Sequence, residues 1–267
     1  MNGTMNCAPL ARNPPGTGNA AELLHKFMAL PSETVTLPVR GWRIDPKKAL
    51  FVAALCWTGF AVMVWLVETR HTGQFDRIGL MFWRGDAPDL APRGPEWLLE
   101  AVRDLTSLGG VLLRHLIALG ALVALLFLRM RREAMLLALT IAGGWVVNSA
   151  VKWLVGRPRP EIVPHLTEAG GASFPSGHSF NSAVVFIAIA LAFATMGTRH
   201  SVRYTIIGSA ILLSLLVAGS RVWLGVHFPS DVLAGWLGGA GWAFLAAAVL
   251  RPTARKAAEK VEEAAAG

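Results

Sequence analysis

Hydrophobic residues gather into six long runs separated by polar connections. The runs cover residues 49–67, 111–128, 134–151, 180–196, 204–219 and 232–250. A helix needs roughly 20 mainly apolar residues to cross a bilayer, and each run approaches that length. Runs of this size also occur as buried helices of soluble α-domains. Six in one chain, two of them joined only by residues 129–133, favour an all-α integral membrane bundle of six transmembrane helices.

The rest of the chain divides into a head, one long connection and a tail. Residues 1–48 are rich in Asn, Pro, Gly and Thr, which predicts a mostly unstructured head. The membrane domain then covers residues 49–250, and residues 251–267 form the tail. We expect no cleavable signal peptide, because the first strongly apolar run begins near Ala49 and no small-residue cleavage site follows it.

The long connection, residues 68–110, contains two further apolar pieces. Gly94-Pro95-Glu96 predicts a helix start with proline in the first turn. The helix that follows places apolar side chains on one face: Trp97, Leu98, Ala101, Val102 and Leu105. Such a helix suits a membrane surface or an ordinary packing contact with the bundle, and both stay open. A less regular apolar patch lies at 75–83.

Composition supports the membrane assignment. Hydrophobic residues make up 54% of the chain and charged residues 16%, whereas soluble domains carry about 25% charged residues. The net charge of +8 would also fit a nucleic-acid-binding protein, but no nucleic-acid motif accompanies it, so we expect no nucleic-acid partner. Cys7 and Cys56 have no metal-ligand spacing, which argues against a zinc site and against a disulfide framework.

The distribution of basic residues predicts the orientation. Most of the 25 Lys and Arg residues lie in the head, in the tail and in the connections after the second and fourth runs. Under the positive-inside rule, both ends of the chain are then cytoplasmic. An even number of spans places the connections after the third and fifth runs on the outer side.

Two polar blocks flank the outer ends of the third and fourth runs. Lys152 and Arg159 bracket a proline-containing turn, a rigid basic loop that by itself would suit any membrane interface. Ser176-Gly177-His178 leads directly into the fourth run, where a helix N-terminus offers unpaired amides to an anion. Alone, this second block would indicate only a helix cap.

A third polar block joins the fifth and sixth runs. Arg221 adds a cation, and Asp231 follows His227 by four residues at the expected start of the last helix. A carboxylate in that position can accept one imidazole N–H and leave the other nitrogen free to attack phosphorus. Alone, Asp231 would be interpreted as a helix N-cap.

In their order and spacing, the three blocks resemble the signature of the type 2 phosphatidic acid phosphatase superfamily of lipid phosphate phosphatases, in its bacterial membrane-bound branch. Every signature position is filled, and the resemblance covers roughly residues 108–250. It implies that phosphate is bound by Lys152, Arg159, Ser176, the Gly177 amide and Arg221. It implies three catalytic residues, with His178 as general acid, His227 as nucleophile and Asp231 as its orienting partner. Arg157 is not a signature position, and its contact with substrate stays open.

The resemblance implies an enzyme that hydrolyses the phosphate or diphosphate of a membrane lipid through a phosphohistidine, without metal or cofactor. Family-implied substrates are phosphatidylglycerophosphate, phosphatidic acid and undecaprenyl diphosphate. The same site would serve a phosphotransferase, and the related vanadate-dependent haloperoxidases share the anion pocket, although they are generally soluble. A non-enzymatic transporter would also show six spans and buried charges, but it needs no such histidine pair. The expected location is the bacterial inner membrane, with the site on the periplasmic face.

Overall fold

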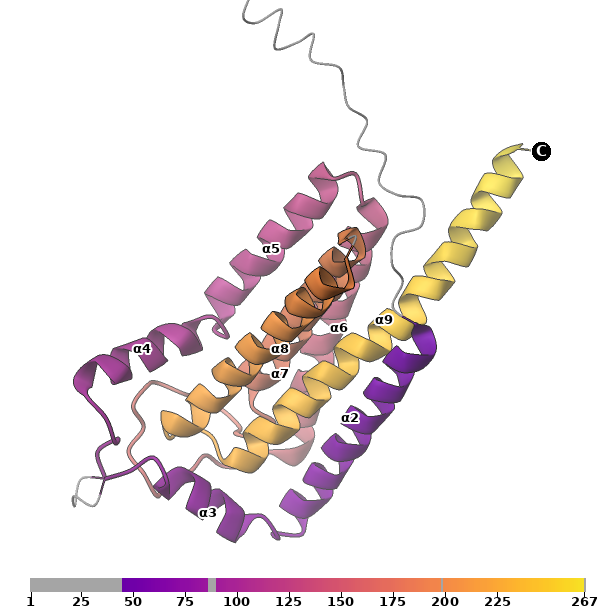
Figure 1. Ribbon diagram of the computed structural model, residues 1–267. Coiled ribbons are helices and arrows are strands. Elements are labelled where there is room, and N and C mark those ends of the chain that lie inside the picture. The colour runs from indigo at the N-terminus through magenta and orange to yellow at the C-terminus, as the bar shows by residue number, and fades with distance from the viewer. Residues whose placement is uncertain (1–44, 86–89, 198, 267) are drawn as a thin grey trace, which may run out of the picture. The chain divides into compact units, whose positions relative to one another are not determined.

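The computed structural model describes residues 45–85, 90–197 and 199–266 (Figure 1). The chain divides into two units, and the described residues all lie in the second, Arg40–Gly267. The predicted unstructured head, apart from its last four residues, lies outside the described residues, as does Cys7. All the described helices belong to the second unit.

Every element assigned in the described part of the chain is helical, which confirms the predicted all-α class. Two short helices occupy the long connection: α3 (Gly73–Met81) and α4 (Glu96–Ser107). The long helices are α2 (Pro46–Glu68), α5 (Val111–Phe127), α6 (Arg131–Val155), α7 (Gly177–Phe193), α8 (His200–Trp223) and α9 (Pro229–Ala266). The 3₁₀ turn η1 (Ala194–Met196) extends α7.

Five helices are long and apolar enough to cross a membrane by length and composition: α2, α6, α7 with η1, α8, and α9 as far as Val249. The expected span at 111–128 corresponds to α5, which has only 17 residues. It reaches spanning length together with α4, from which it is bent by 50°. Large apolar side chains on the outer faces, such as Phe51, Phe127 and Trp153, are more than 70% exposed. Lipid is the solvent that accommodates such faces.

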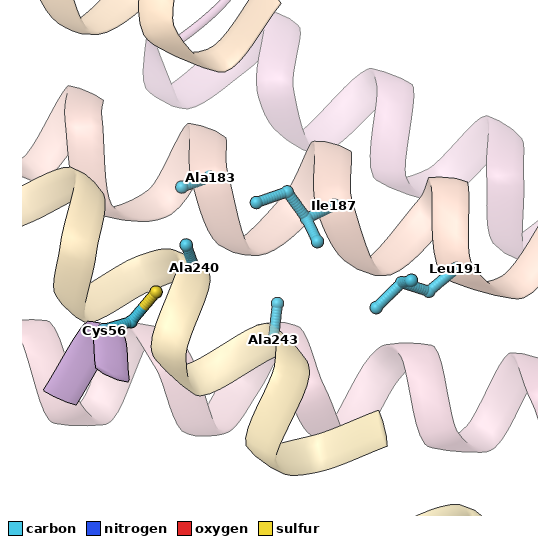
Figure 2. Close-up of a cluster of buried hydrophobic side chains, with 6 residues drawn as sticks. All are labelled: Cys56, Ala183, Ile187, Leu191, Ala240 and Ala243. Atoms are coloured by element: carbon cyan, nitrogen blue, oxygen red, sulfur yellow. The ribbon is translucent and has the colours of Figure 1, made fainter. Parts of the chain in front are cut away.

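Helix α7 is the centre of the bundle, with 78% of its spanning window buried. One core cluster joins it to α2 and α9 through small and aliphatic side chains (Figure 2): Cys56, Ala183, Ile187, Leu191, Ala240 and Ala243. Small residues allow α9 and α7 to approach closely, because a Cβ at Gly239 would collide with the carbonyl oxygen of Phe180. This close packing fixes the two helices whose N-terminal ends carry candidate site residues.

Four long helices have one of their ends at the same end of the bundle, where α3 and α4 also lie (Figure 1). There α6 and α8 end and α7 and α9 begin. Helix α6 ends at Val155, where its C-cap Gly156 adopts the left-handed conformation (φ 59°) before the proline-containing turn begins.

Helix α4 begins at Glu96, with Pro95 at the N-cap and not inside the first turn. Leu98, Leu99 and Val102 pack against a cluster formed by Trp223, Leu224 and Val226. Leu98 and Val102 of the predicted apolar face therefore pack on the bundle, whereas Ala101 is exposed and Trp97 is 69% exposed. Through this contact α4 supports the end of α8 and the loop after it.

Candidate active site

The folded chain brings the predicted site residues to the end of the bundle where α3 and α4 lie. Lys152 is in the last turn of α6 and Arg221 in the last turn of α8. Ser176 is the N-cap of α7, followed by Gly177 and His178 in its first turn. Arg159 and His227 lie in the loops after α6 and α8, and Asp231 lies in the first turn of α9.

His227 lies between Asp231 and Arg159, and both the histidine and the carboxylate are buried. Nδ1 of the imidazole is 3.5 Å from Oδ2 of Asp231, and Nε2 is 3.1 Å from Nη1 of Arg159. A guanidinium can only donate, so Nε2 accepts and the imidazole proton belongs on Nδ1, facing the carboxylate. We assign this tautomer from the contacts. The single lone pair of Nε2 then accepts from Arg159, and this hydrogen bond must open before Nε2 can act as a nucleophile.

The surroundings of His227 act on its pKa in opposite directions. Burial lowers the pKa most, the nearby carboxylate of Asp231 raises it, and the positive charges of Arg159 and Arg221 lower it further. The result is a pKa of about 4, so the imidazole is uncharged at neutral pH. An uncharged imidazole is the nucleophilic form.

Arg159 is oriented by backbone carbonyl groups. Its Nε and Nη2 donate to the carbonyl oxygens of Gly171 (3.1 Å) and Gly170 (2.7 Å), and its Nη1 donates to that of Val226 (2.8 Å). Burial lowers the pKa of this guanidinium, although the charge of Asp231 opposes the change. The cation is thus held in place beside the histidine.

The second block places the first turn of α7, with its free amides, next to Lys152. The Lys152 ammonium donates to the carbonyl oxygen of Ala172 (2.6 Å), and a Cβ on Gly177 would lie 3.5 Å from Cε of Lys152. The Ser176 hydroxyl accepts a hydrogen bond from the hydroxyl of Ser179 (2.9 Å). The Ser176 amide donates to the carbonyl oxygen of Asp231 (3.0 Å), which joins the second block to the third.

Helices α4 and α5 contribute residues that the sequence alone did not indicate. Arg221 donates from Nη1 to the hydroxyl of Thr106 in α4 (3.0 Å). A Cβ on Gly109, between α4 and α5, would lie 3.2 Å from Cδ2 of His178. The buried Arg114 donates to the Gly109 carbonyl oxygen (2.8 Å). His178 also interacts electrostatically with Arg221 and His227, so the two histidines share one site.

Arg157, whose role the sequence left open, pairs with two carboxylates. Its guanidinium donates to Asp231 (2.7 Å) and to Asp76 of α3 (2.8 Å), and it lies 4.1 Å from the ring centroid of Phe228. Both carboxylates are buried, and the Arg157 side chain is 17% exposed. Asp76 was not anticipated from the sequence; its only signal was a charge within the apolar patch at 75–83.

No group of three His, Cys, Asp or Glu side chains in the described part of the chain is arranged to hold a metal ion. The charged groups around His227 are side-chain cations, with one carboxylate behind the ring. This arrangement can bind a phosphate and stabilise the negative charge of a pentavalent phosphorus.

Comparison with known proteins gives consistent matches. The family model of the PAP2 superfamily matches residues 133–254. Phosphatidylglycerophosphatase B of Bacillus subtilis (strain 168) is 35% identical over 145 residues, which cover 52% of this chain and 69% of that protein. The crystal structure described as the first transmembrane PAP2 type phosphatidylglycerolphosphate phosphatase from Bacillus subtilis superposes with a TM-score of 0.66. It is 26% identical, over 73% of this chain and 94% of that chain.

Two other relatives are matched over about half of their length. The lipid A 1-phosphatase of Rhizobium etli is 34% identical over 120 residues, covering 42% of this chain and 47% of that protein. The undecaprenyl-diphosphatase BcrC of Bacillus subtilis (strain 168) is 28% identical over 110 residues, covering 39% and 50%. The matched sequences, the apolar helices and the structural likeness agree: the chain is an integral membrane protein and belongs to the PAP2 superfamily.

Proposed function

We propose that this protein hydrolyses the phosphomonoester or diphosphate of a membrane lipid, without a metal ion, through a phosphohistidine on His227. The observation that carries the proposal is the position of the His227 imidazole. Nε2 faces the Arg159 guanidinium at 3.1 Å, and Nδ1 faces the Asp231 carboxylate at 3.5 Å. When a phosphate oxygen replaces Nε2 as the acceptor of this Arg159 N–H, the unprotonated nitrogen is placed for attack on phosphorus.

The reaction proceeds in two steps. In the first, Nε2 of His227 attacks phosphorus as the bond to the lipid oxygen breaks, and His178 gives its proton to that oxygen. In the second, His178 takes a proton from water, the water oxygen bonds to phosphorus, and the bond to His227 breaks. Asp231 stabilises the positive charge that the imidazole carries between the steps.

Five groups can stabilise the negative charge on the phosphoryl group while it is transferred. They are Lys152, Arg159, Ser176, the Gly177 amide and Arg221. Lys152 lies against Gly177, and Arg159 and Arg221 both act on the charge state of His227. Donors fixed before the reaction, as Arg159 is by three carbonyl groups, are the usual source of such stabilisation.

The substrate is drawn from the lipid phosphates named for the relatives. Those names include a phosphatidylglycerophosphatase, a lipid A 1-phosphatase and undecaprenyl-diphosphatases. We infer that the site lies on the outer face of the bacterial inner membrane, because the basic residues predict cytoplasmic ends and an even number of spans places the site opposite them.

Phosphate release from purified lipids tests the proposal. Phosphatidylglycerophosphate, phosphatidic acid, lipid A and undecaprenyl diphosphate are presented in mixed micelles to the detergent-purified protein, with His227→Ala as the blank. We expect release from at least one lipid, unchanged by EDTA and blocked by vanadate, which mimics pentavalent phosphorus. Absence of release from every lipid would contradict a lipid phosphatase. Activity lost to EDTA and restored specifically by magnesium or zinc would contradict the metal-free mechanism.

A further inference from the structure

Helix α3 buries the charged side chain of Asp76 while two of its large apolar side chains are exposed. Phe75 and Ile78 are more than half exposed, whereas Asp76 between them is 1% exposed. A carboxylate is costly to bury unless hydrogen bonds and a counter-charge compensate it. The hydrogen-bond partners of Asp76 therefore indicate the structural role of α3.

The partners of the Asp76 carboxylate are Arg157, in the loop after α6, and Ser230, in the first turn of α9 next to Asp231. Oδ2 accepts from Nη2 of Arg157 (2.8 Å) and from the Ser230 hydroxyl (2.8 Å). Oδ1 accepts from the Ser230 amide (2.9 Å). Asp76 thus contacts the residue immediately before Asp231, and it reaches Asp231 itself through Arg157.

The contact with the Ser230 amide fixes the start of α9. Pro229 is the first residue of this helix, and Phe228 before it has no side-chain oxygen with which to cap the free amides. Asp76 supplies the missing acceptor from another helix. Asp231 accepts from the Phe228 amide through Oδ2 (3.0 Å), the same oxygen that faces His227. The orientation of the Asp231 carboxylate therefore depends on how this helix start is held.

Arg157 completes the arrangement because one guanidinium serves both carboxylates. Its Nη1 donates to Oδ1 of Asp231 and to the Ser230 hydroxyl, while Nη2 donates to Asp76. The contact with Asp76 holds the Arg157 guanidinium in one orientation. Because its positive charge is shared between two carboxylates, Arg157 neutralises the charge of Asp231 only in part. With Asp76 removed, Arg157 would have a single carboxylate partner, and the Phe228 amide would be the fixed backbone donor left to orient Asp231.

We propose that Asp76 is a positioning residue for the reaction: through Ser230 and Arg157 it holds Asp231 in the orientation that directs His227 at phosphorus. The proposal rests on the proposed function. It extends the machinery beyond the residues matched by the family model, 133–254, to a helix of the outer connection. It also gives Arg157 a place behind Asp231 and away from the phosphate.

The test compares kcat and KM for folded variants on whichever lipid the wild-type protein cleaves. Asp76→Asn removes the charge while keeping size and one acceptor oxygen. Ser230→Ala removes the shared hydroxyl, and the double variant combines both changes. Asp104→Asn is the matched control, because Asp104 is an exposed carboxylate in α4 of the same connection. Size exclusion and thermal unfolding in detergent measure the folded fraction.

We expect Asp76→Asn to lower kcat by about 10- to 100-fold with KM nearly unchanged, as for a misplaced reacting group. The rate of phosphoenzyme formation in a single turnover should fall by the same factor. Ser230→Ala should lower kcat less, and the double variant should fall short of the product of the two effects, because both act on one network. Asp104→Asn should behave as wild type.

A wild-type kcat in folded Asp76→Asn overturns this proposal while leaving the proposed function intact. The proposal is also overturned if the activity of Asp76→Asn falls only in proportion to the fraction of protein that is folded. Should Asp76→Asn fail to fold, Asp76→Glu and Ser230→Ala provide the same comparison, and an unchanged kcat in both overturns the proposal. A wild-type protein that releases no phosphate from any lipid overturns the proposed function, and this inference with it.

Discussion

At the scale of single residues, the site depends on a buried histidine under opposing electrostatic influences. His227 is 2% exposed, and two guanidinium groups lower its pKa while Asp231 raises it. Cations beside the ring would prevent its protonation and also attract the phosphate. The same arrangement therefore keeps the nucleophile uncharged and holds the substrate against it.

The pKa of His227 should be measurable directly. We expect the imidazole to titrate near pH 4, well below the ordinary histidine value of about 6.5, because burial and the neighbouring cations disfavour the charged ring. NMR of protein carrying ¹³C-labelled histidine would follow the titration, with His227→Gln to assign the signal. A midpoint at 6.5 or above would contradict the buried position between cations.

The depressed pKa also has a consequence for stability. An unfolded chain takes up the proton at about pH 6.5, whereas the folded protein resists until about pH 4. The contribution of this histidine is therefore complete above pH 6.5 and is lost as the pH falls toward 4. Between pH 7 and pH 5, the thermal midpoint should fall further for wild type than for His227→Gln.

Asp231→Asn tests the orienting carboxylate. An amide in this position no longer stabilises the charged imidazole and favours the wrong tautomer, so we expect kcat to fall by up to about 10⁴-fold. Membrane insertion should persist. The measurement is turnover by protein recovered from membranes and shown by size exclusion to be folded, with Asp104→Asn beside it. Turnover within a few-fold of wild type would exclude the proposed role.

At the scale of elements, the ends of four helices hold the site in place. Gly156 ends α6 one turn after Lys152, and Ser176 begins α7 just before His178. Between α7 and α9, a Cβ on Gly235 would lie 2.7 Å from the Ser176 carbonyl oxygen. Close packing of the two helices thus controls the separation of the second and third blocks.

The α7–α9 contact yields a stability prediction with a matched control. Gly239→Ala places a methyl group against the Phe180 carbonyl oxygen, so the helices must separate. We expect a loss of about 1–3 kcal/mol in unfolding free energy. Gly208→Ala in α8 meets nothing within 4 Å, and we expect it to be neutral or slightly stabilising. Unfolding of both variants in the same detergent makes the comparison; equal effects would contradict the close packing.

The features of the fold that depend on neighbouring residues could be predicted from the sequence. The spans, the N-terminal turn of α7 and the Asp231 position in α9 follow from periodicity, composition and capping, and the structure has them. The pairing of Asp76 with Arg157 joins residues 81 positions apart, and its contact with Ser230 spans 154. No periodic pattern marks such contacts. The predicted run at 111–128 is present as α5, but its apolar pattern does not show that α5 reaches spanning length only together with α4, from which it is bent by 50°.

At the scale of the whole molecule, the two ends of the helical bundle in the second unit carry different residues. One end carries α3, α4 and the candidate site, and at the other α5 joins α6 and α7 joins α8 (Figure 1). The basic residues Arg129 and Arg131 lie at that second end. If the site lies on the outer face, as proposed, a substrate in the outer leaflet would reach it without crossing the membrane.

Cysteine labelling tests this orientation. Glu168, in the loop between α6 and α7, and His200, at the start of α8, are both exposed and lie at opposite ends of the bundle. Each is replaced by cysteine in a Cys7→Ser, Cys56→Ser background. In intact cells, we expect an impermeant thiol reagent to modify position 168 only, and both positions after permeabilisation. Modification at 200 with protection at 168 would invert the orientation.

The central claim is that His227 carries the phosphoryl group, and rapid quench of a single turnover tests it most directly. With a lipid labelled in the scissile phosphate, wild type should form an acid-labile, base-stable phosphoenzyme that decays as phosphate appears. His178→Ala should still accumulate label from a substrate with a good leaving group, because water attack slows by something like 10²- to 10⁴-fold. His227→Ala should form none. A phosphoenzyme in the His227→Ala protein would contradict the account and make His178 the nucleophile.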